Sequence, residues 1–315
     1  MCAAASLISS NSLFIRLNML SALLLKIELS YLWHSYFFFR VYLSIIVNYI
    51  NLNGKIISNV DGGLPVDNDA FRYGYGLFET MLVQDGVIRL KEFHWERLFA
   101  GLRQLYFEIP MLMTAEWLEE EVMRTVKKNH GEKLCRVRLQ MYAGGGGLYS
   151  VESRHPGFVI ECFSLEEDNL RLNNNGLIVG VAAGLSKSAD TLSNLKSCNA
   201  LIYAMAARQA KEHKWNDALL YNNNEHVIES TIANIFWIKG GTVYTPPLSD
   251  GCVAGVMRRH IMGRITVSER TLKIEDLLQA DEVFLTNAIK KMRWVGIIDG
   301  KKYGNEQIKD VYRYL

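Results

Sequence analysis

Apolar residues in the first half of the chain follow two periods, one typical of strands and one typical of helices. Alternation of apolar and polar residues predicts strands, here over residues 49–52, 55–57, 76–83, 87–90, 134–142 and 158–163. Apolar residues three or four positions apart predict helices, here over residues 92–105 and 115–129. Asn53-Gly54 and Gln84-Asp85-Gly86 lie between neighbouring strands and favour hairpins. We therefore predict a small α+β domain over residues 49–163.

The predicted strand 134–142 has two unlike faces. Arg136 and Arg138 lie on one face, and Val137 and Leu139 lie on the other, because successive side chains of a strand point to opposite sides. The pattern predicts a sheet with one buried face and one polar face.

A polar, acidic segment over residues 164–176 follows, and it ends in Asn173-Asn174-Asn175-Gly176. Such a composition is typical of a linker between domains. Beyond it, the pattern predicts strands over 177–183, 217–221, 227–229, 234–239, 243–245 and 281–286, and helices over 199–214, 255–264 and 274–279. We interpret residues 177–315 as a second, larger domain.

Residues 1–48 differ from the rest, because they are rich in Leu, Ile, Phe and Tyr and poor in charge. A membrane helix needs about 20 mostly apolar residues, and this run is interrupted by Arg16, Lys26, Glu28 and Arg40. We interpret residues 1–48 as an apolar extension outside the fold, with translation starting at Val47. A membrane-facing segment and a targeting peptide are the alternatives, and a membrane anchor is not what we expect.

Composition argues against several classes of function. The chain has 315 residues with 35 basic and 33 acidic side chains, a net charge of +2, which is too balanced for a nucleic-acid surface. The five cysteines are far apart and the seven histidines show no metal-ligand spacing, so we expect no metal site and no disulfide framework. Widely spaced cysteines favour reduced thiols and a cytoplasmic location. The glycine run 144–147 lacks the Lys-Ser/Thr ending of a phosphate-binding loop, and we interpret it as a loop at the mouth of a site.

The residues that indicate chemistry form an ordered set along the chain. Arg97 stands in His94-Trp95-Glu96-Arg97-Leu98, and Lys196 stands in Leu192-Ser193-Asn194-Leu195-Lys196-Ser197. Glu229 follows in Val227-Ile228-Glu229-Ser230-Thr231, and then come Tyr244-Thr245-Pro246-Pro247 and Gly255-Val256-Met257-Arg258. A lone lysine before a predicted helix is more often an ordinary solvated side chain. The order and spacing of the whole set carry the interpretation.

This set resembles the fold-type IV enzymes that use pyridoxal phosphate, which include branched-chain aminotransferases, D-amino acid aminotransferases and 4-amino-4-deoxychorismate lyases. The resemblance runs from about Tyr49 to the end of the sequence. It implies an α+β / α/β fold of two domains with the cofactor between them. It also implies a homodimer in which the loop near residues 144–149 contributes to the partner's site.

The resemblance implies a role for each matching residue. Lys196 would form the Schiff base with the cofactor and move protons, and Glu229 would stabilise the protonated pyridine nitrogen. Cofactor phosphate would be bound by Arg97, by backbone amides at a helix start, and by the turn after a late strand. The predicted phosphate contacts besides Arg97 are Val256, Met257, Asn287 and Ala288.

Three residues are candidates for contact with a small-molecule amine substrate. Tyr73 and Phe78 lie in Phe71-Arg72-Tyr73-Gly74-Tyr75-Gly76-Leu77-Phe78-Glu79-Thr80, which resembles the opening active-site motif of the family. Either residue could instead be plain core. Arg138 lines up with a family arginine that faces substrate carboxylates, and a structural salt bridge is the alternative.

Three details favour the lyases over the aminotransferases: Thr286-Asn287-Ala288, the Trp237-Ile238-Lys239-Gly240 ending, and Arg138-Leu139 in place of Arg-Pro. The resemblance then implies cleavage of 4-amino-4-deoxychorismate to 4-aminobenzoate and pyruvate, a step of folate precursor synthesis. A class IV aminotransferase acting on branched-chain or D-amino acids with 2-oxoglutarate is the alternative. A non-catalytic, membrane-tethered protein is a third interpretation, which the intact Arg97, Lys196 and Glu229 oppose.

One position departs from the family pattern. Many relatives have a tyrosine four or five residues after the lysine, near the cofactor's phenolic oxygen, whereas this chain has Ala200 and Leu201. Asn199 and Tyr203 are the candidates that could substitute.

Overall fold

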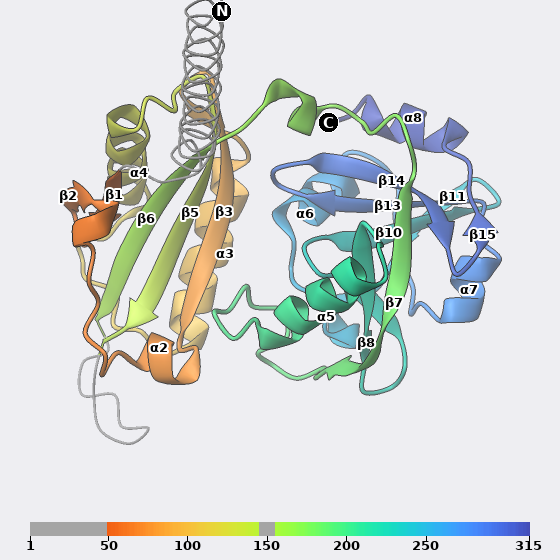
Figure 1. The fold of residues 1–315 in the computed structure, drawn as a ribbon, viewed down its shortest axis with the longest axis horizontal. Helices are drawn as coiled ribbons and strands as arrows, with labels where there is room; N and C mark the ends of the chain where they lie inside the picture. The colour runs from red at the N-terminus through yellow and green to blue at the C-terminus, as the bar shows by residue number, and fades with distance from the viewer. Residues whose placement is uncertain (1–48, 145–154) are drawn as a thin grey trace, which may run out of the picture. The chain divides into compact units, whose positions relative to one another are not determined.

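Two sheets flanked by helices make up the part of the chain that the computed structural model describes, residues 49–144 and 155–315 (Figure 1). Both sheets belong to one unit, Val47–Leu315. The expectations for residues 1–46 and for most of the loop near 144–149 lie outside the described residues. Within the described residues, no helix is long and apolar enough to cross a membrane.

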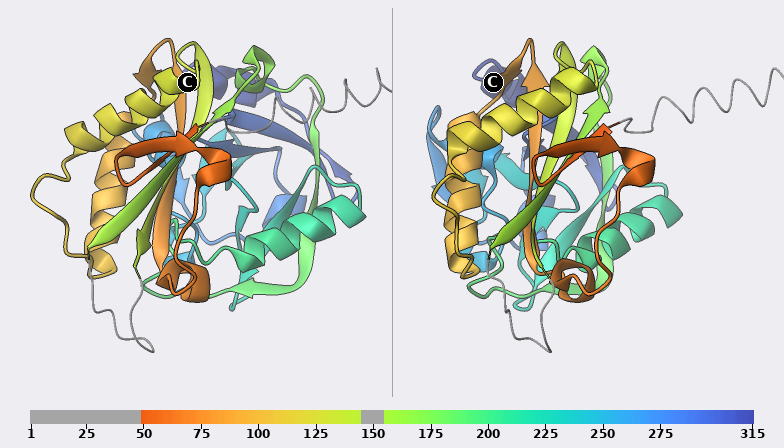
Figure 2. Two further views of the ribbon diagram at one scale, coloured as in Figure 1. Left: turned by 60° about the vertical axis from the view of Figure 1, so that its left-hand side comes forward. Right: turned by 90° about the vertical axis from the view of Figure 1, so that its left-hand side faces the viewer.

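The first sheet has six antiparallel strands in the order β2-β1-β6-β5-β3-β4. The strands are β1 (Tyr49–Leu52), β2 (Lys55–Ser58), β3 (Gly76–Gln84), β4 (Val87–Ile88), β5 (Leu134–Ala143) and β6 (Pro156–Ser164). The helices around it are η1 (Asn59–Asp61), α2 (Asp69–Tyr73), α3 (Lys91–Gln104) and α4 (Ala115–Lys128). Figure 2 shows α3 and α4 on one face of this sheet.

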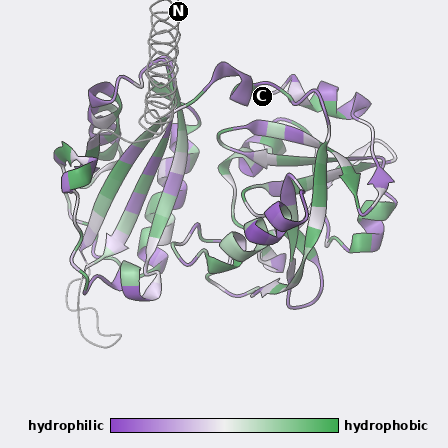
Figure 3. Cartoon of the chain, viewed as in Figure 1, coloured by the Kyte–Doolittle hydropathy of each residue, from purple (hydrophilic) through white to green (hydrophobic). Residues whose placement is uncertain are grey.

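Alternation along the strands decides which face of this sheet is buried. Val137, Leu139 and Met141 of β5 are fully buried and pack into one core with residues of α3 and α4. Arg136 and Arg138 are only partly buried and lie on the opposite face. Bands of alternating hydropathy along these strands show the same division (Figure 3). The polar face is therefore available to build a site.

The second sheet has the order β12-β11-β10-β13-β14-β7-β8-β9, with β15 paired to β14. The pair Asn234↔Glu229 also joins β9 to β10, so the six strands from β10 to β9 form a closed ring. The strands are β7 (Leu177–Lys187), β8 (Asp217–Asn222), β9 (Val227–Ser230), β10 (Asn234–Lys239), β11 (Thr242–Thr245), β12 (Val267–Glu269), β13 (Glu282–Asn287), β14 (Lys291–Ile298) and β15 (Lys301–Lys302).

Helices pack outside this ring. They are η2 (Glu167–Leu170), α5 (Leu201–Glu212), η3 (Leu248–Asp250), α6 (Val256–Met262), α7 (Ile274–Leu278) and α8 (Glu306–Tyr312). Phe236 and Phe284 stack at 5.0 Å between ring centroids and share a core with Met257 and Ile261 of α6. On another flank, Ala206 and Ala210 of α5 pack against small and branched residues of β7, β8 and β9. The first contact positions α6, and the second positions α5, whose Tyr203 reaches the carboxylate of Glu229.

Most elements predicted from the pattern are confirmed, with shifts at the ends. The hairpin at Asn53-Gly54 is present, since Leu52 pairs with Lys55. The helix predicted over 199–214 begins later, at Leu201, and the one predicted over 255–264 is shorter. The strand predicted over 87–90 covers only Val87–Ile88. The pattern missed α2, α8, β12 and β14. In β14, Lys291, Arg293 and Gly296 interrupt the apolar run, and pairing with β13 and β7 overrides this weak local preference.

Gly180 of β7 allows a close approach of Trp215. A Cβ atom on Gly180 would lie 2.2 Å from the indole ring. We therefore expect Gly180→Ala to lower the free energy of unfolding by ~1–3 kcal/mol, as overpacked sites do. Urea unfolding measures this change. Gly304→Ala is the control, because no atom lies within 4 Å of a Cβ there; equal effects of the two substitutions would contradict the packing argument.

Candidate functional site

Lys196 is held against the first sheet, although it follows a strand of the second. The amide of Phe78 donates to the carbonyl oxygen of Lys196 at 2.9 Å, and the amide of Cys198 donates to that of Gly76 at 2.9 Å. A single antiparallel bridge joins Leu77 to Ser197. The segment 196–198 thus extends the pairing of β3, and the lysine side chain starts from the boundary between the two sheets.

The surroundings of Lys196 disfavour its charged form. Its Nζ lies 4.3 Å from the centroid of the Phe78 ring. Burial first, and then the charges of Arg97 and Arg138, lower the pKa of Lys196 from 10.5 to about 8, against the opposite effect of Glu79 and Glu229. The charges of these four groups therefore act on the lysine amine. Near neutral pH a useful fraction of the amine is unprotonated and can act as a nucleophile or a base.

Arg97 is fixed by a buried carboxylate. Its Nε donates to Glu79 Oε1 at 2.8 Å, its Nη2 donates to Oε2, and its Nη1 donates to the carbonyl oxygen of Ala254 at 3.0 Å. Burial raises the pKa of Glu79. The charge of Arg97, followed by that of His94, more than offsets this effect and brings the pKa to about 2. His94 Nδ1 lies 2.6 Å from Glu79 Oε2. Because a guanidinium has five N–H donors, Arg97 keeps two donors for an anion.

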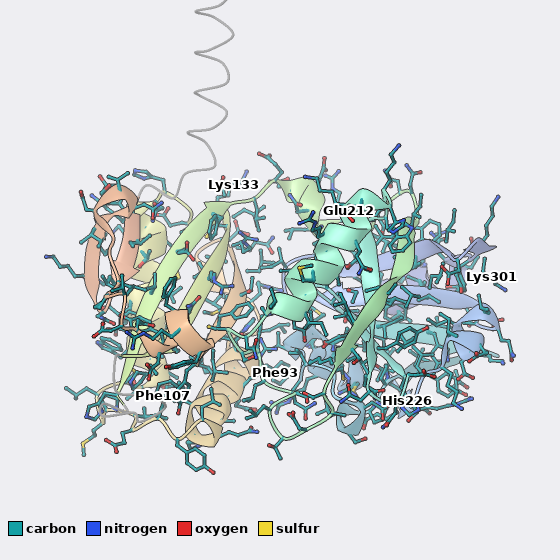
Figure 4. All side chains as sticks on the ribbon, turned by 60° about the horizontal axis from the view of Figure 1, so that its bottom comes forward. Phe93, Phe107, Lys133, Glu212, His226 and Lys301 are labelled. Atoms are coloured by element: carbon teal, nitrogen blue, oxygen red, sulfur yellow. The ribbon has the colours of Figure 1, made fainter. Side chains whose placement is uncertain are left out.

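Helices α3 and α6 meet beside this arginine. Phe93 of α3, labelled in Figure 4, has its ring centroid 6.3 Å from that of His260. The guanidinium of Arg259 lies 4.6 Å from the same ring centroid. Arg97 is one turn further along α3, and its bond to Ala254 brings it to the segment that leads into α6.

Glu229 lies where the ring of strands closes. It is 3% exposed. Its Oε1 accepts from Lys187 Nζ at 2.7 Å and from the phenol of Tyr203 at 2.7 Å, and its Oε2 accepts from the amide of Val253 at 2.9 Å. Burial, followed by the charge of Glu229, raises the pKa of Tyr203 far above its ordinary value. The phenol therefore stays a donor to this carboxylate.

The start of α6 offers amides and one buried hydroxyl group. The first amides of a helix have no partners within it, no side chain caps α6, and Val256 and Met257 are its first two residues. The Oγ1 atom of Thr286 is buried without a hydrogen-bond partner. Thr286 shares a strand face with Phe284, which packs against Met257. A Cβ on Gly255 would lie 1.9 Å from Asn234 Oδ1, so this approach requires glycine.

Asn287 and Ala288 lie in the turn after β13, at the same end of the sheet as the start of α6. The Oδ1 atom of Asn287 accepts from the amides of Ile289 at 3.0 Å and Lys290 at 2.8 Å. Its side chain therefore shapes the turn. Met257 and Ala288 line one common cavity, so the structure brings these two predicted contacts together.

Phe78 and Arg138 lie together near the lysine, on the polar face of the first sheet. The Arg138 guanidinium is 3.9 Å from the Phe78 ring centroid. It donates to Gln140 at 2.8 Å and is 3.8 Å from Glu161. The close contact between Phe78, Arg138 and Lys196 supports a pocket position for Phe78 and not a plain core one, since Phe78 is only partly buried.

Tyr73 is the outlying member of the predicted set. It ends α2 and is 38% exposed. The next residue, Gly74, has a left-handed φ of 69°. Gly74 also lies close to Asn199, because a Cβ atom added to Gly74 would be 3.1 Å from the Cα atom of Asn199. Tyr73 is thus near the segment that follows Lys196.

The structure distinguishes the two candidates for the missing tyrosine. Tyr203 projects from α5 to Glu229, the residue predicted to face the pyridine nitrogen, so its hydroxyl is engaged at that end of the site. Asn199 is exposed and lies next to Gly74. Neither stands in the position that the family pattern gives to the tyrosine.

Several residues of this site were missed by sequence reasoning. Glu79, Lys187 and Thr286 were not singled out, although Glu79 and Thr286 lie inside quoted motifs. Their roles depend on which strand faces which, and spacing along the chain contains no such information. In the described ranges, no group of three or more His, Cys, Asp or Glu side chains could hold a metal ion.

Comparison with known proteins gives one family and two activities. The chain matches the family model described as amino-transferase class IV over residues 76–298. It is 29% identical to an aminodeoxychorismate lyase of Vibrio harveyi, over 72% of this chain and 84% of that protein. It is also 29% identical to a Methanocaldococcus jannaschii protein with a provisional name of branched-chain-amino-acid aminotransferase, over 84% of this chain and 93% of that protein.

A solved structure shows the same fold. A branched-chain amino acid aminotransferase from the archaeon Thermoproteus uzoniensis, crystallised with norvaline, superposes with a TM-score of 0.75 and 24% identity, over 84% of this chain and 93% of that one. Another solved branched-chain amino acid aminotransferase is complexed with N-(5'-phosphopyridoxyl)-L-glutamate, an adduct of the cofactor with an amino acid.

The lowered pKa of Lys196 can be measured directly. We expect its reductive methylation, followed site by site with mass spectrometry, to rise with pH and to reach half its maximum at about pH 8. The sign follows because only the unprotonated amine reacts, and a lowered pKa yields that form at lower pH. Ordinary lysines, with a pKa of about 10.4, should still be gaining reactivity at pH 9. A Lys196 profile that matches theirs would contradict the desolvated environment.

Proposed function

This chain belongs to the class IV aminotransferase family, and we propose that it is a pyridoxal phosphate enzyme whose reaction is the cleavage of 4-amino-4-deoxychorismate. Family members bind this cofactor, as the phosphopyridoxyl complex illustrates. The observation that carries the proposal is the convergence of Arg97, Glu79, Glu229 and Arg138 on the amine of Lys196. A nucleophilic lysine, a buried carboxylate and an anion-binding arginine are the three groups that the cofactor needs.

The residues present fit the cofactor at both of its ends. Arg97 has two unused donors, and the amides of Val256 and Met257 and the orphan hydroxyl of Thr286 lie at the start of α6. These groups would hold the phosphate, with the turn at Asn287 and Ala288 beside them. Glu229 would face the pyridine nitrogen, because a buried carboxylate stabilises a protonated ring.

When bound, the cofactor supplies an electron-accepting ring conjugated to the substrate amine. Lys196 would hold the cofactor through its aldehyde and would give way there to the substrate amine. Lys196 then removes the proton from the amine-bearing carbon, for which its lowered pKa suits it. It can later donate a proton to the side chain that leaves as pyruvate. Arg138 binds a substrate carboxylate, and Phe78 keeps water from the lysine.

The more specific part of the proposal is that the reaction is the lyase reaction and not a transamination. It is supported by the Thr286-Asn287-Ala288 turn, by Arg138-Leu139 and by the likeness to the Vibrio lyase. An aminotransferase is the second candidate, favoured by the similar likeness to the Methanocaldococcus protein. In that reaction the same proton removal by Lys196 is followed by return of a proton elsewhere and release of an oxo acid.

A substrate assay separates the two reactions. We expect the purified protein with pyridoxal phosphate to release 4-aminobenzoate and pyruvate from 4-amino-4-deoxychorismate. Branched-chain or D-amino acids with 2-oxoglutarate should give little glutamate. Fast glutamate formation without 4-aminobenzoate would make the protein an aminotransferase. Borohydride reduction should leave the cofactor on Lys196 in either case, and an adduct on another lysine would refute the assigned site.

The role of Glu229 predicts a specific defect in Glu229→Gln. The amide cannot stabilise a protonated pyridine, so we expect the variant to keep bound cofactor and to lose roughly a hundredfold or more in kcat. Absorbance of the cofactor and steady-state turnover are the two measurements. Near-normal kcat in the variant would show that another group faces the ring nitrogen.

The family resemblance also predicts a homodimer in the cytoplasm. Sedimentation of the active protein tests the dimer, and we expect the mass of two chains. A monomer that keeps full turnover at the same concentration would contradict it.

A further inference from the structure

Lys187 is a nearly buried ammonium group to which no role has been given so far. It is the last residue of β7, its side chain is 11% exposed, and its Nζ lies 2.7 Å from Glu229 Oε1. It also lies 5.3 Å from the centroid of the Tyr203 ring. Burying an ammonium is costly unless a carboxylate pairs with it. The pairing with Glu229 therefore explains why Lys187 is tolerated, and it changes what Glu229 can do.

The hydrogen bonds of Glu229 leave one place for a further donor. A carboxylate has about four acceptor sites, two on each oxygen. Lys187 and Tyr203 occupy both sites of Oε1, and the amide of Val253 occupies one site of Oε2. Among the described residues, nothing else donates to Oε2. A ring nitrogen that approaches Glu229 would therefore bind to Oε2.

The ion pair also changes the charge that a ring nitrogen meets. Glu229 alone would present a full negative charge, which favours a protonated pyridine. Together with Lys187 it forms a neutral pair, so a second cation gains less. The phenol of Tyr203 cannot restore the charge, because burial keeps it protonated. The lysine therefore opposes protonation of the ring.

We propose that Lys187 is a positioning residue that directs the cofactor's pyridine nitrogen to Oε2 of Glu229 and lowers the proton affinity of that nitrogen. This inference rests on the proposed function, because it takes Glu229 as the partner of the ring. It adds a control on how strongly the ring accepts electrons. It also compensates at the nitrogen end for the tyrosine that Ala200 and Leu201 replace at the other end.

The test compares charge with hydrogen bonding at position 187. Lys187→Met removes both, Lys187→Gln keeps a donor without charge, and Lys187→Arg keeps the charge. Each protein is loaded with pyridoxal phosphate labelled with ¹⁵N in the ring, and the ¹⁵N chemical shift is followed with pH. Lys309→Met is the control, because Lys309 is exposed and pairs only with Glu306 on α8.

We expect the ring nitrogen of Lys187→Met and of Lys187→Gln to titrate about one pH unit or more higher than in the wild type, the usual effect of a close charge. Lys187→Arg and Lys309→Met should titrate with the wild type. Equal titration in all five proteins would overturn the proposal. Should Lys187→Met fail to fold, Lys187→Gln decides the outcome alone.

Failure of the proposed function gives a different result. If the wild type binds no cofactor at Lys196, no ring signal appears in any variant. If the wild type binds it but Glu229→Gln titrates unchanged, Glu229 is not the ring's partner and Lys187 cannot act through it. A shift in Glu229→Gln without one in Lys187→Met leaves the function intact and removes only the role of Lys187.

A second observation concerns a cavity of about 350 Å³ beside α6, which Met257 and Ala288 also line. Five basic side chains from four separate segments line it, and its lining contains no acidic side chain: Arg89, His260, Arg264, Lys291 and Arg313. Burial lowers the pKa of Lys291, and the charge of Arg89 lowers it further. Burial lowers the pKa of His260 too, followed by the charge of Arg264.

Such a gathering of like charges is unfavourable on its own. Arg313 pairs with Asp310 at 3.0 Å, and Lys291 donates to the main-chain oxygen of Leu315 at 3.1 Å. In the described parts of the chain, neither Arg89 nor Arg264 forms an ion pair with a carboxylate. The whole chain has a net charge of only +2, so the excess is local. The apolar floor, which includes Leu82, Leu90 and Met257, would suit a small carbon skeleton.

We infer that this cavity binds a compact oxyanion with two or more negative charges, carried by phosphate or by paired carboxylates. Thermal unfolding of the cofactor-loaded protein is measured with inorganic phosphate, with citrate and with sodium chloride at matched ionic strength. Absorbance of the bound cofactor checks that phosphate does not displace it. The double variant Arg89→Gln/Arg264→Gln removes the two unpaired cations. Arg208→Gln, an exposed site that pairs with Glu212, is the control.

We expect phosphate or citrate to raise the midpoint of unfolding of the wild type and of Arg208→Gln, and to have no such effect on the double variant. The anion that raises the midpoint more indicates whether the ligand carries phosphate or paired carboxylates. An equal effect of sodium chloride, or an undiminished effect in the double variant, would overturn this inference.

Discussion

The pairing of residues 196–198 with the edge of β3 is the contact on which the candidate site depends. Lys196 follows a strand of the second sheet, and this pairing fixes its backbone to the first sheet. Both bonds use backbone atoms, and the second requires glycine at position 76, because a Cβ there would lie 2.4 Å from the carbonyl oxygen of Met141. Because Phe78 is one of the paired residues, its ring is placed beside the lysine amine. The neighbouring strand β5 then brings Arg138 to the same point, through the register in which Thr80 faces Arg138.

Charge balance follows from this arrangement. Two buried carboxylates each neutralise one cation: Glu79 pairs with Arg97, and Glu229 pairs with Lys187. Arg138, with only a 3.8 Å approach to Glu161, and Lys196 remain. The described site therefore carries an excess of positive charge, which suits anions such as a phosphate or a substrate carboxylate. Burial first, and then the charges of Arg97 and Arg138, explain why the lysine releases its proton more easily than an ordinary one.

The sequence allowed the two sheets and the central residues to be predicted, but not the contacts among strands. Lys196, Glu229 and Arg97 lie in motifs of recognisable order, and the structure brings them together. Lys187 and Thr286 were missed because each acts across strands that are far apart in the chain. Lys187 reaches Glu229 over 42 residues, and Thr286 faces α6 only because β13 pairs with β10. Local periodicity contains no information on such register. For the same reason β14, which its neighbours stabilise, was not predicted.

The replacement of the family tyrosine by Ala200 and Leu201 shifts control of the ring to its nitrogen end. At that end the structure has three donors on the carboxylate of Glu229: Lys187, Tyr203 and the amide of Val253. A carboxylate with three donors is held in one orientation, so it cannot turn to follow the ring. Under the proposed function, the ring would come to the one acceptor site left on Oε2. The position that we propose for the cofactor therefore depends on β7 and α5, which supply Lys187 and Tyr203, as much as on the strand that carries Glu229.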